Sequence, residues 1–175
     1  MKAYEEHRER APKKIKAIII TASTSRYQKM QRGENYEDES GSIIALKLKE
    51  KGHEVLSRSL VNDDISMIRK EVLKGIYFSE ADVIIINGGT GVSPRDVTIE
   101  AVEPLLEKKL EGFGEIFRRL TYDRIGSIAI LTRAMAGIIN RKLVICLPGS
   151  PDAVELGMNL ILDELGHIIF ISKGV

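Results

Sequence analysis

The chain has 175 residues, 43% of them hydrophobic, and a formal net charge of +1 at pH 7, which predicts one globular domain with a sizeable core. The charge argues against nucleic acid as a partner, since no block of basic residues stands out, and no apolar run approaches the ~18 residues of a membrane helix. Cys146 is the single cysteine, so a disulfide within the chain is excluded. It lies in an apolar run and is expected to be inert core.

The first elements are a charged segment and a buried strand. Residues 1–14 are mostly charged and are expected to be a solvated, disordered tail ahead of one domain over residues 15–175, with a short helix docked on a neighbouring subunit as the alternative. The isoleucine-rich run from Ile15 to Ala22 predicts a strand. The turn after it, which contains Ser23, is rich in hydroxyls. Such a turn either binds a ligand beyond the strand end or serves only as a turn.

A polar region and a second strand come next. Residues 26–40 lack periodicity and predict a long binding loop or lid. A helix capped by Asp38 or Ser40 is expected to follow, to about Lys51. The less apolar run from Glu54 to Val61 then predicts a strand near a sheet edge.

Two aspartates, Asp63 and Asp64, open the next predicted helix, whose apolar residues recur at helical spacing. One aspartate is expected to lie near the cap, and both could serve the helix dipole. Because this helix also begins beyond a strand end, the acidic pair could instead lie across a crevice from Asp96.

The buried run Val83-Ile84-Ile85-Ile86 leads into the central motif, Asn87-Gly88-Gly89-Thr90-Gly91-Val92-Ser93-Pro94-Arg95-Asp96. Three glycines in four residues allow a sharp turn and a close backbone approach to a ligand. Ser93, Pro94 and Asp96 match an N-cap, a first helical residue and a capping-box partner, so a helix is expected to start at Ser93. A strand, a glycine loop and a helix N-terminus together suit a phosphate. A purely structural turn is the alternative, because the spacing is neither the dinucleotide fingerprint nor a P-loop.

The rest of the chain continues to alternate strands and helices, which predicts a three-layer α/β domain with a mostly parallel sheet. The three histidines have no metal-ligand spacing and are expected to be surface residues. The remaining expected elements are a helix from Ile99 to Leu110, a segment from Gly112 carrying Glu115 and Arg118, buried strands at 127–131 and 143–147, a helix from Ser150-Pro151, and a closing strand at 168–172.

Four motifs in this order resemble the MogA/MoaB family of molybdenum or tungsten cofactor biosynthesis proteins, and the long polar 26–40 loop is closest to MoaB. The resemblance covers roughly residues 15–165. The motifs are the glycine stretch continued to Ala101, Gly112-Phe113-Gly114-Glu115 with Arg118, Thr132-Arg133-Ala134-Met135-Ala136-Gly137, and Leu147-Pro148-Gly149-Ser150-Pro151-Asp152-Ala153-Val154.

The resemblance implies a Rossmann-like molybdopterin-binding fold and Mg-ATP-dependent adenylylation of molybdopterin, with release of pyrophosphate. By matching positions, Asp63 and Asp96 would be the catalytic and Mg²⁺-binding carboxylates, and Ser150 would lie on the pterin side. The other ligand-binding candidates are Ser23, Gly88, Gly89, Thr90, Gly91, Ser93, Arg95, Arg133, Pro148 and Gly149.

Three interpretations remain open from the sequence. The chain is an adenylyltransferase, a non-catalytic binding protein for molybdopterin or its precursor of the MoaB type, or an interaction domain whose glycine loop is only a turn. The family resemblance also implies a homotrimer or hexamer, and other cofactor biosynthesis proteins as possible partners. With no membrane or signal-like segment, the expected compartment is the cytoplasm.

Overall fold

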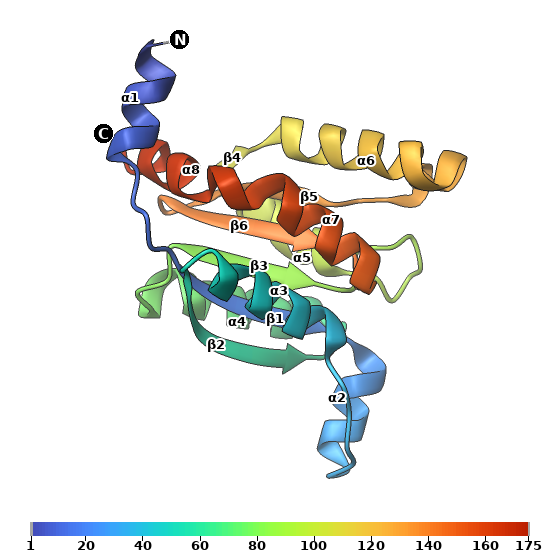
Figure 1. Ribbon diagram of the computed structural model, residues 1–175. Helices are drawn as coiled ribbons and strands as arrows, with labels where there is room; N and C mark the ends of the chain where they lie inside the picture. The colour runs from blue at the N-terminus through green and yellow to red at the C-terminus, as the bar shows by residue number, and fades with distance from the viewer. Residues whose placement is uncertain (1, 175) are drawn as a thin grey trace.

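The computed structural model describes residues 2–174, with side chains from residue 5 onward, as three layers built on a six-stranded sheet (Figure 1). The strand order is β2-β1-β3-β6-β5-β4. The first four strands in this order are parallel, β5 is antiparallel to β6, and β4 is antiparallel to β5. The strands are β1 (Lys16–Ala22), β2 (Glu54–Val61), β3 (Val83–Asn87), β4 (Lys108–Lys109), β5 (Met135–Ile139) and β6 (Lys142–Leu147). The expected three-layer, mostly parallel α/β fold is confirmed, with β2 at an edge.

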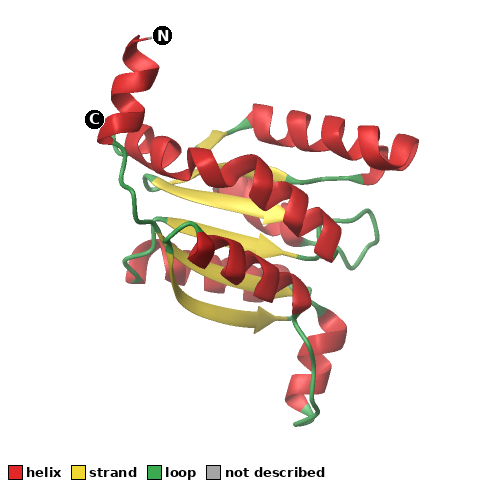
Figure 2. Cartoon of the chain, viewed as in Figure 1, coloured by secondary structure: helices red, strands yellow, loops and turns green. Residues whose placement is uncertain are grey.

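Helices cover both faces of this sheet (Figure 2). Isoleucines of β1 alternate between the two layers, with Ile19 in one core cluster and Ile18 and Ile20 in the other. The first cluster packs under α3, α6, α7 and α8, and the second under α4 and α5. The helices on the two faces are α3 (Glu39–Glu50), α4 (Ile65–Phe78), α5 (Thr98–Val102), α6 (Glu111–Ile125), α7 (Pro151–Ile161) and α8 (Leu165–Ser172).

Helices α3, α4 and α7 begin with the side-chain caps that their sequences predict. Asp38 Oδ1 accepts from the N–H of Gly41 at the start of α3 (3.0 Å), and Asp64 Oδ1 accepts from Met67 at the start of α4 (2.8 Å). Ser150 is the N-cap of α7. These caps satisfy backbone donors that have no partner within the first turn of a helix.

The charged N-terminal segment is a helix, so the expected disordered tail is wrong. Helix α1 (Lys2–Arg10) lies against α8 of the same chain (Figure 1), where Arg8 forms an ion pair with Glu164 and the Arg10 guanidinium lies 5.3 Å from the Phe170 ring centroid. The aromatic ring and the ion pair give this polar helix a docking surface that its own sequence does not reveal. Met1 of the expected tail and Val175 of the expected domain lie outside the described residues.

Other expected elements differ from the structure. The first part of the loop expected at residues 26–40 belongs instead to helix α2 (Thr24–Gln31), and a short loop follows it. The expected strand at 127–131 is the 3-10 helix η2 (Gly126–Leu131), and the expected closing strand belongs to α8. Short apolar runs do not distinguish a strand from a helical turn, and in η2 the apolar side chains are largely exposed, with Ile130 at 81%.

The helix expected from Ile99 to Leu110 is also shorter than predicted. Helix α5 ends at Val102, and a 3-10 turn, η1 (Glu103–Leu105), leads directly to β4. A second short 3-10 turn, η3 (Leu162–Glu164), joins α7 to α8. Among the described helices, none is long and apolar enough to cross a membrane.

Candidate functional site

Three loops meet at the carboxyl edge of the parallel strands, after β1, β3 and β6. Gly88 follows β3 with φ +93°, and its N–H donates to the carbonyl of Leu147 at the end of β6 (3.0 Å). A Cβ on Gly88 would lie 2.2 Å from the carbonyl oxygen of Ala22, at the end of β1, and a Cβ on Gly149 would lie 3.0 Å from Gly88 Cα. Glycine is therefore required at position 88 by both its left-handed backbone and its neighbours.

The backbone of Gly89 lies close to two side chains from other parts of the chain. Its φ is +64°, and a Cβ there would lie 2.5 Å from Thr98 Oγ1 and 2.7 Å from Asp63 Oδ1. Thr98, the first residue of α5, fixes the turn, because its N–H donates to the Gly89 carbonyl (2.9 Å) and its hydroxyl to the Gly88 carbonyl (2.8 Å). Thr98 is not among the site residues expected from the sequence. In the sequence, Thr98 is distinguished only as a polar residue among the apolar positions that follow the motif.

Asp63 presents its carboxylate to the same turn. Its Oδ2 accepts hydrogen bonds from the N–H and from the hydroxyl of Thr24, both at 2.8 Å. Its Oδ1 is buried beside Gly89 and has no hydrogen-bond partner among the described residues. Asp64 caps α4, so capping does not explain Asp63. A buried carboxylate oxygen without a partner is costly, which makes it a candidate ligand-binding atom.

The loop after the glycines differs from its prediction. The expected helix at Ser93 is wrong, because residues Ser93 to Asp96 form a turn closed by an Asp96 N–H to Ser93 carbonyl hydrogen bond (2.9 Å), and α5 begins only at Thr98. The N–H of Thr98 donates back to Gly89, not to the carbonyl four residues before it as a helix would require. With only five residues, α5 does not supply the expected anion-binding helix N-terminus.

Asp96 is held inside this loop by one of its two carboxylate oxygens. Asp96 Oδ2 accepts from the N–H of Ser93 (3.0 Å). This is the carboxylate hydrogen bond of a capping box, although no helix begins at Ser93. A Cβ on Gly91 would lie 2.6 Å from the same oxygen. Glycine at position 91 therefore makes room for a carboxylate and is not required by a left-handed backbone. Asp96 Oδ1 has no hydrogen-bond partner among the described residues.

Arg133 holds the loop from the side of β5. Its Nε donates to the Thr90 carbonyl (2.9 Å), one Nη to the Gly91 carbonyl (2.5 Å), and the other Nη to Glu100 Oε1 (2.5 Å). The hydrogen bond from Arg133 to Glu100 keeps the pKa of the Glu100 carboxyl below its usual value. The guanidinium that the sequence analysis assigned to a ligand is thus directed at the protein itself.

The turn after β6 borders a cavity of about 510 Å³ between α6 and α7. The hydroxyl of Ser40 fixes this turn by donating to the Gly149 carbonyl (2.7 Å), and Ser150 Oγ accepts from the N–H of Ala153 (3.3 Å). The lining combines apolar side chains with a polar rim and consists of Phe117, Thr121, Arg124, Ile125, Thr132, Pro148, Ser150, Asp152, Ala153 and Leu156. An apolar wall with a few polar groups is the usual composition of a small-molecule site.

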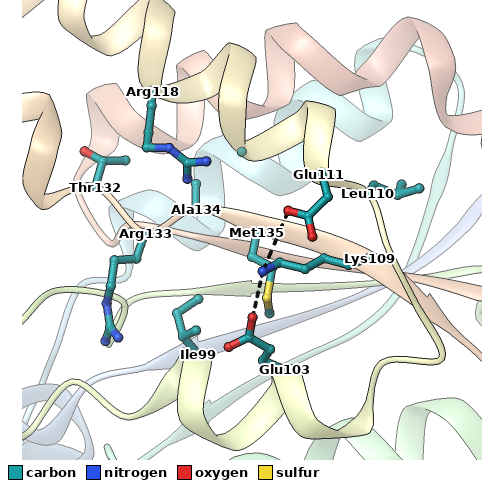
Figure 3. Close-up of a pocket in the computed structure, with 11 residues that line it drawn as sticks. Ile99, Glu103, Lys109, Leu110, Glu111, Arg118, Thr132, Arg133, Ala134 and Met135 are labelled. Carbon is teal, nitrogen blue, oxygen red and sulfur yellow. Dashed lines mark hydrogen bonds and ion pairs between the residues drawn. The ribbon is translucent and has the colours of Figure 1, made fainter.

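A second cavity, of about 260 Å³, lies on the other side of Thr132 (Figure 3). Its carboxylates Glu103 and Glu111 lie 2.7 and 3.8 Å from Lys109 Nζ. Arg118 reaches in from α6 with its guanidinium over Gly114, and among the described residues it has no hydrogen-bond or ion-pair partner.

The remaining candidates lie around the glycine turn. Ser23 caps α2 by accepting from the Arg26 N–H (3.4 Å), and the Arg26 side chain donates to the Glu37 carbonyl (2.6 Å). Thr90 is buried and Arg95 is exposed. Burial raises the pKa of the Cys146 thiol, which fits its expected role as inert core.

The donor set fits a hard cation such as Mg²⁺, which one or two carboxylates bind together with phosphate oxygens. Asp63 and Asp96 each use one oxygen in a protein hydrogen bond and leave the other without a partner. In the described part of the chain, no group of three or more His, Cys, Asp or Glu residues could form an all-protein metal site. A cation bound by these two carboxylates would complete its coordination with oxygens of a ligand and of water.

Comparison with known proteins gives one matching family model, "Probable molybdopterin binding domain", over residues 18–167. The chain is 48% identical over 167 residues to "Molybdenum cofactor biosynthesis protein B" of Bacillus cereus, covering 94% of this chain and 95% of that protein. It is 40% identical over 171 residues to "Molybdopterin adenylyltransferase" of Pyrococcus furiosus, with 94% and 95% covered.

Solved structures agree with this similarity. A crystal structure of a molybdenum cofactor biosynthesis protein B matches with a TM-score of 0.83 and 47% identity, covering 93% of this chain and 98% of that one. At this similarity the fold is shared over nearly the whole chain.

Proposed function

Since the chain belongs to the MogA/MoaB family of molybdopterin-binding, molybdenum cofactor biosynthesis proteins, we propose that it adenylylates molybdopterin with ATP. In this reaction, an oxygen of the terminal phosphate of molybdopterin attacks the α-phosphorus of ATP and forms a new P–O bond. The bond from the α-phosphorus to the oxygen that bridges to the β-phosphate breaks. The products are adenylyl-molybdopterin and pyrophosphate.

One observation carries the proposal: Asp63 and Asp96 each leave a carboxylate oxygen without a protein partner beside the glycine turn. Transfer of a phosphorus group requires mainly positioning and neutralisation of charge, and little other chemistry from the protein. A glycine turn that offers backbone N–H groups, with two partly unpaired carboxylates next to it, suits Mg-ATP. A turn with no ligand would gain nothing from leaving a buried carboxylate oxygen unpaired.

The residues divide between the two substrates. Gly88, Gly89, Thr90 and Gly91 would hold the phosphates of ATP, with Ser23, Ser93 and Arg95 near them. Asp63 and Asp96 would bind Mg²⁺, which supplies positive charge to the phosphates. Pro148, Gly149 and Ser150 would face the pterin, and the 510 Å³ cavity offers an apolar wall for its ring system.

Arg133 has a different role from the one the sequence suggested. Its three donor atoms hold the carbonyls of Thr90 and Gly91 and the Glu100 carboxylate, so we assign it to fixing the phosphate-binding loop. Arg118 lines the 260 Å³ cavity and has no protein partner within the described chain, so it is better placed than Arg133 to meet an anionic ligand.

The test is incubation of the protein with molybdopterin and Mg-ATP, with pyrophosphate measured over time. We expect stoichiometric pyrophosphate and adenylyl-molybdopterin, and neither product when EDTA removes Mg²⁺. Tight binding of molybdopterin without pyrophosphate would instead support a non-catalytic binding protein. The relatives named molybdenum cofactor biosynthesis protein B favour this second candidate. We propose the cytoplasm as the compartment, because ATP is supplied there.

We also propose that the chain assembles as a trimer or a hexamer. Helix α6 and η2 pack together and expose six apolar side chains, which we name the α6–η2 ridge: Ile116, Leu120, Ile125, Ile128, Ile130 and Leu131. Several exposed apolar side chains on two elements that pack together are typical of a protein–protein interface.

Light scattering at micromolar concentration tests the assembly. We expect a mass of three or six times 19.5 kDa for the wild type and a lower mass for Ile130→Glu. Phe78→Glu changes an exposed aromatic residue on α4, outside the ridge, and should keep the wild-type mass. A wild-type monomer would overturn the proposal.

A further inference from the structure

We propose that Thr24 is a positioning residue for Asp63 and that it makes the site selective for Mg²⁺ over Ca²⁺. By holding one carboxylate oxygen, Thr24 limits Asp63 to binding a cation through the other oxygen alone. This inference rests on the proposed function, because it concerns the cation that accompanies ATP.

The hydrogen bonds of Thr24 converge on a single atom. Its N–H and its hydroxyl both donate to Asp63 Oδ2 at 2.8 Å, one from the backbone and one from the side chain. Two donors on one oxygen prevent rotation of the carboxylate, and hydrogen bonds to an ionised group are the strong ones. Thr24 therefore fixes both which oxygen of Asp63 is occupied and which is left over.

The oxygen left over has a defined direction. Asp63 Oδ1 lies against Gly89, 2.7 Å from the position of a Cβ there, and has no hydrogen-bond partner in the described chain. It thus faces the backbone turn assigned to the ATP phosphates. Groups that orient a metal-binding carboxylate in this way commonly change metal affinity when they are removed.

Asp96 is restrained in the same manner. Its Oδ2 accepts the N–H of Ser93 at 3.0 Å, which again leaves Oδ1. Two carboxylates that each offer one oxygen suit Mg²⁺, which requires six ligands at short distances and keeps several waters. Ca²⁺ takes six to eight oxygens at longer distances and often binds a carboxylate through both oxygens. The hydrogen bonds behind the carboxylates therefore disfavour Ca²⁺.

A merely structural role would also explain part of this geometry. Thr24 is the first residue of α2, and its bonds to Asp63 connect α2 to the loop between β2 and α4. In that case, removing the hydroxyl would lower the melting temperature but leave cation selectivity unchanged. The ratio of Mg²⁺ to Ca²⁺ binding therefore separates the two roles.

The experiment compares Thr24→Val, which removes the hydroxyl, with Thr24→Ser, which keeps it. Mn²⁺ serves as a spectroscopic substitute for Mg²⁺, and its binding to the protein with α,β-methylene-ATP is followed by electron paramagnetic resonance, with Mg²⁺ and Ca²⁺ as competitors. We expect Thr24→Val to weaken Mn²⁺ binding about 10-fold to 100-fold, as loss of such an orienting group does elsewhere. Ca²⁺ should then compete better relative to Mg²⁺.

The controls determine how a failure is interpreted. Thr24→Ser should retain wild-type affinity and selectivity. So should Ser25→Ala, since Ser25 lies in the same turn and its hydroxyl is within hydrogen-bond distance of Ser23 Oγ (3.4 Å) and not of Asp63. If Thr24→Val does not fold, Thr24→Ala replaces it. Unchanged Mn²⁺ affinity and competition in the hydroxyl-free variant overturn this inference. Absence of pyrophosphate from wild-type protein overturns the proposed function, and the two results are measured separately.

Discussion

The two ends of the sheet treat their carboxylates differently. At the amino end, Asp82 uses both oxygens, accepting from the Lys16 N–H and from Lys173 Nζ, each at 3.0 Å. At the carboxyl end, Asp63 and Asp96 each keep one oxygen without a partner in the described chain. Fully paired groups contribute to folding, whereas the buried, unpaired Oδ1 of Asp63 is retained against its desolvation cost. The difference separates a carboxylate that stabilises the fold at the amino end from two carboxylates that we propose as ligand-binding groups at the carboxyl end.

In contrast to the carboxylates, one basic side chain at each end of the sheet has the same role. Lys142 donates to the carbonyls of Gly75 and Ser79 near the end of α4, and Arg133 donates to carbonyls of the glycine loop. Both side chains therefore hold backbone. A basic residue that lies beside a candidate site therefore does not necessarily bind the ligand.

The largest expected effect comes from Gly89→Ala. A methyl group at this position would lie 2.5 Å from Thr98 Oγ1 and 2.7 Å from Asp63 Oδ1, which is closer than van der Waals contact allows, and φ is +64°. The turn and Asp63 would both have to move, so we expect adenylylation to become undetectable in the pyrophosphate assay.

Gly52→Ala is the matched control for Gly89→Ala. Gly52 lies at the amino end with φ +79° and has nothing within 4 Å of a Cβ. We expect it to lose about 1–2 kcal/mol of stability from backbone strain alone and to keep full turnover. Equal turnover in both variants would remove the functional distinction between the two ends.

The next effect is a contrast between two aspartate substitutions. Asp96→Asn keeps an oxygen for the Ser93 N–H but removes the charge that Mg²⁺ requires, so turnover should fall by orders of magnitude while the melting temperature stays nearly constant. Asp82→Asn should lower the melting temperature and leave turnover unchanged, because its partners Lys16 and Lys173 are structural. Thermal melts and pyrophosphate release on both variants test this. An Asp96→Asn variant that is less stable but fully active would show that Asp96 is only a turn residue.

Much of the fold follows from local sequence. The strands β1, β3 and β6 are continuous apolar runs, and α3, α4 and α7 carry their caps in sequence, so these elements are predicted correctly. The failures are the segments whose structure depends on distant partners. Helix α1 is defined by its contacts with α8, and η2 exposes the apolar side chains that suggested a buried strand.

The site shows the same division. The glycines, Asp63 and Asp96 are visible as a motif beyond strand ends, and the structure places them around one turn. The roles of Thr24 and Thr98 depend on hydrogen bonds to residues 39 and 10 positions away, and no local pattern carries them. The helix start at Ser93 was predicted from a capping pattern that is present, but a tertiary hydrogen bond at Thr98 prevents the helix.

A smaller effect is expected from weakening the two backbone-holding cations. Arg133→Lys cannot reproduce the forked set of donors, so we expect the KM for ATP to rise about 10-fold, the scale of losing one hydrogen bond to a charged group. Lys142→Met should lower the melting temperature and leave the KM unchanged. Steady-state kinetics with ATP varied will show whether only the cation at the carboxyl end affects the substrate.

The smallest expected effect is a pH dependence that belongs to the amino end alone. The N–H of Ile15 donates to His53 Nδ1 (3.3 Å), and burial lowers the pKa of this histidine, with the charge of Lys51 as a second cause. A pKa that is lower in the folded than in the unfolded chain means that the unfolded chain binds the proton more readily. The stability from neutral His53 is therefore complete above its ordinary pKa of about 6.5 and is lost as the pH falls through its lower folded-state value.

We expect the melting temperature to fall between pH 7 and pH 5 by less than Gly52→Ala lowers it. His53→Asn should reduce this dependence of the melting temperature on pH. The KM for ATP should not follow this titration, since His53 lies at the opposite end of the sheet from the glycine turn. A KM that changes with His53→Asn would show that the two ends are coupled.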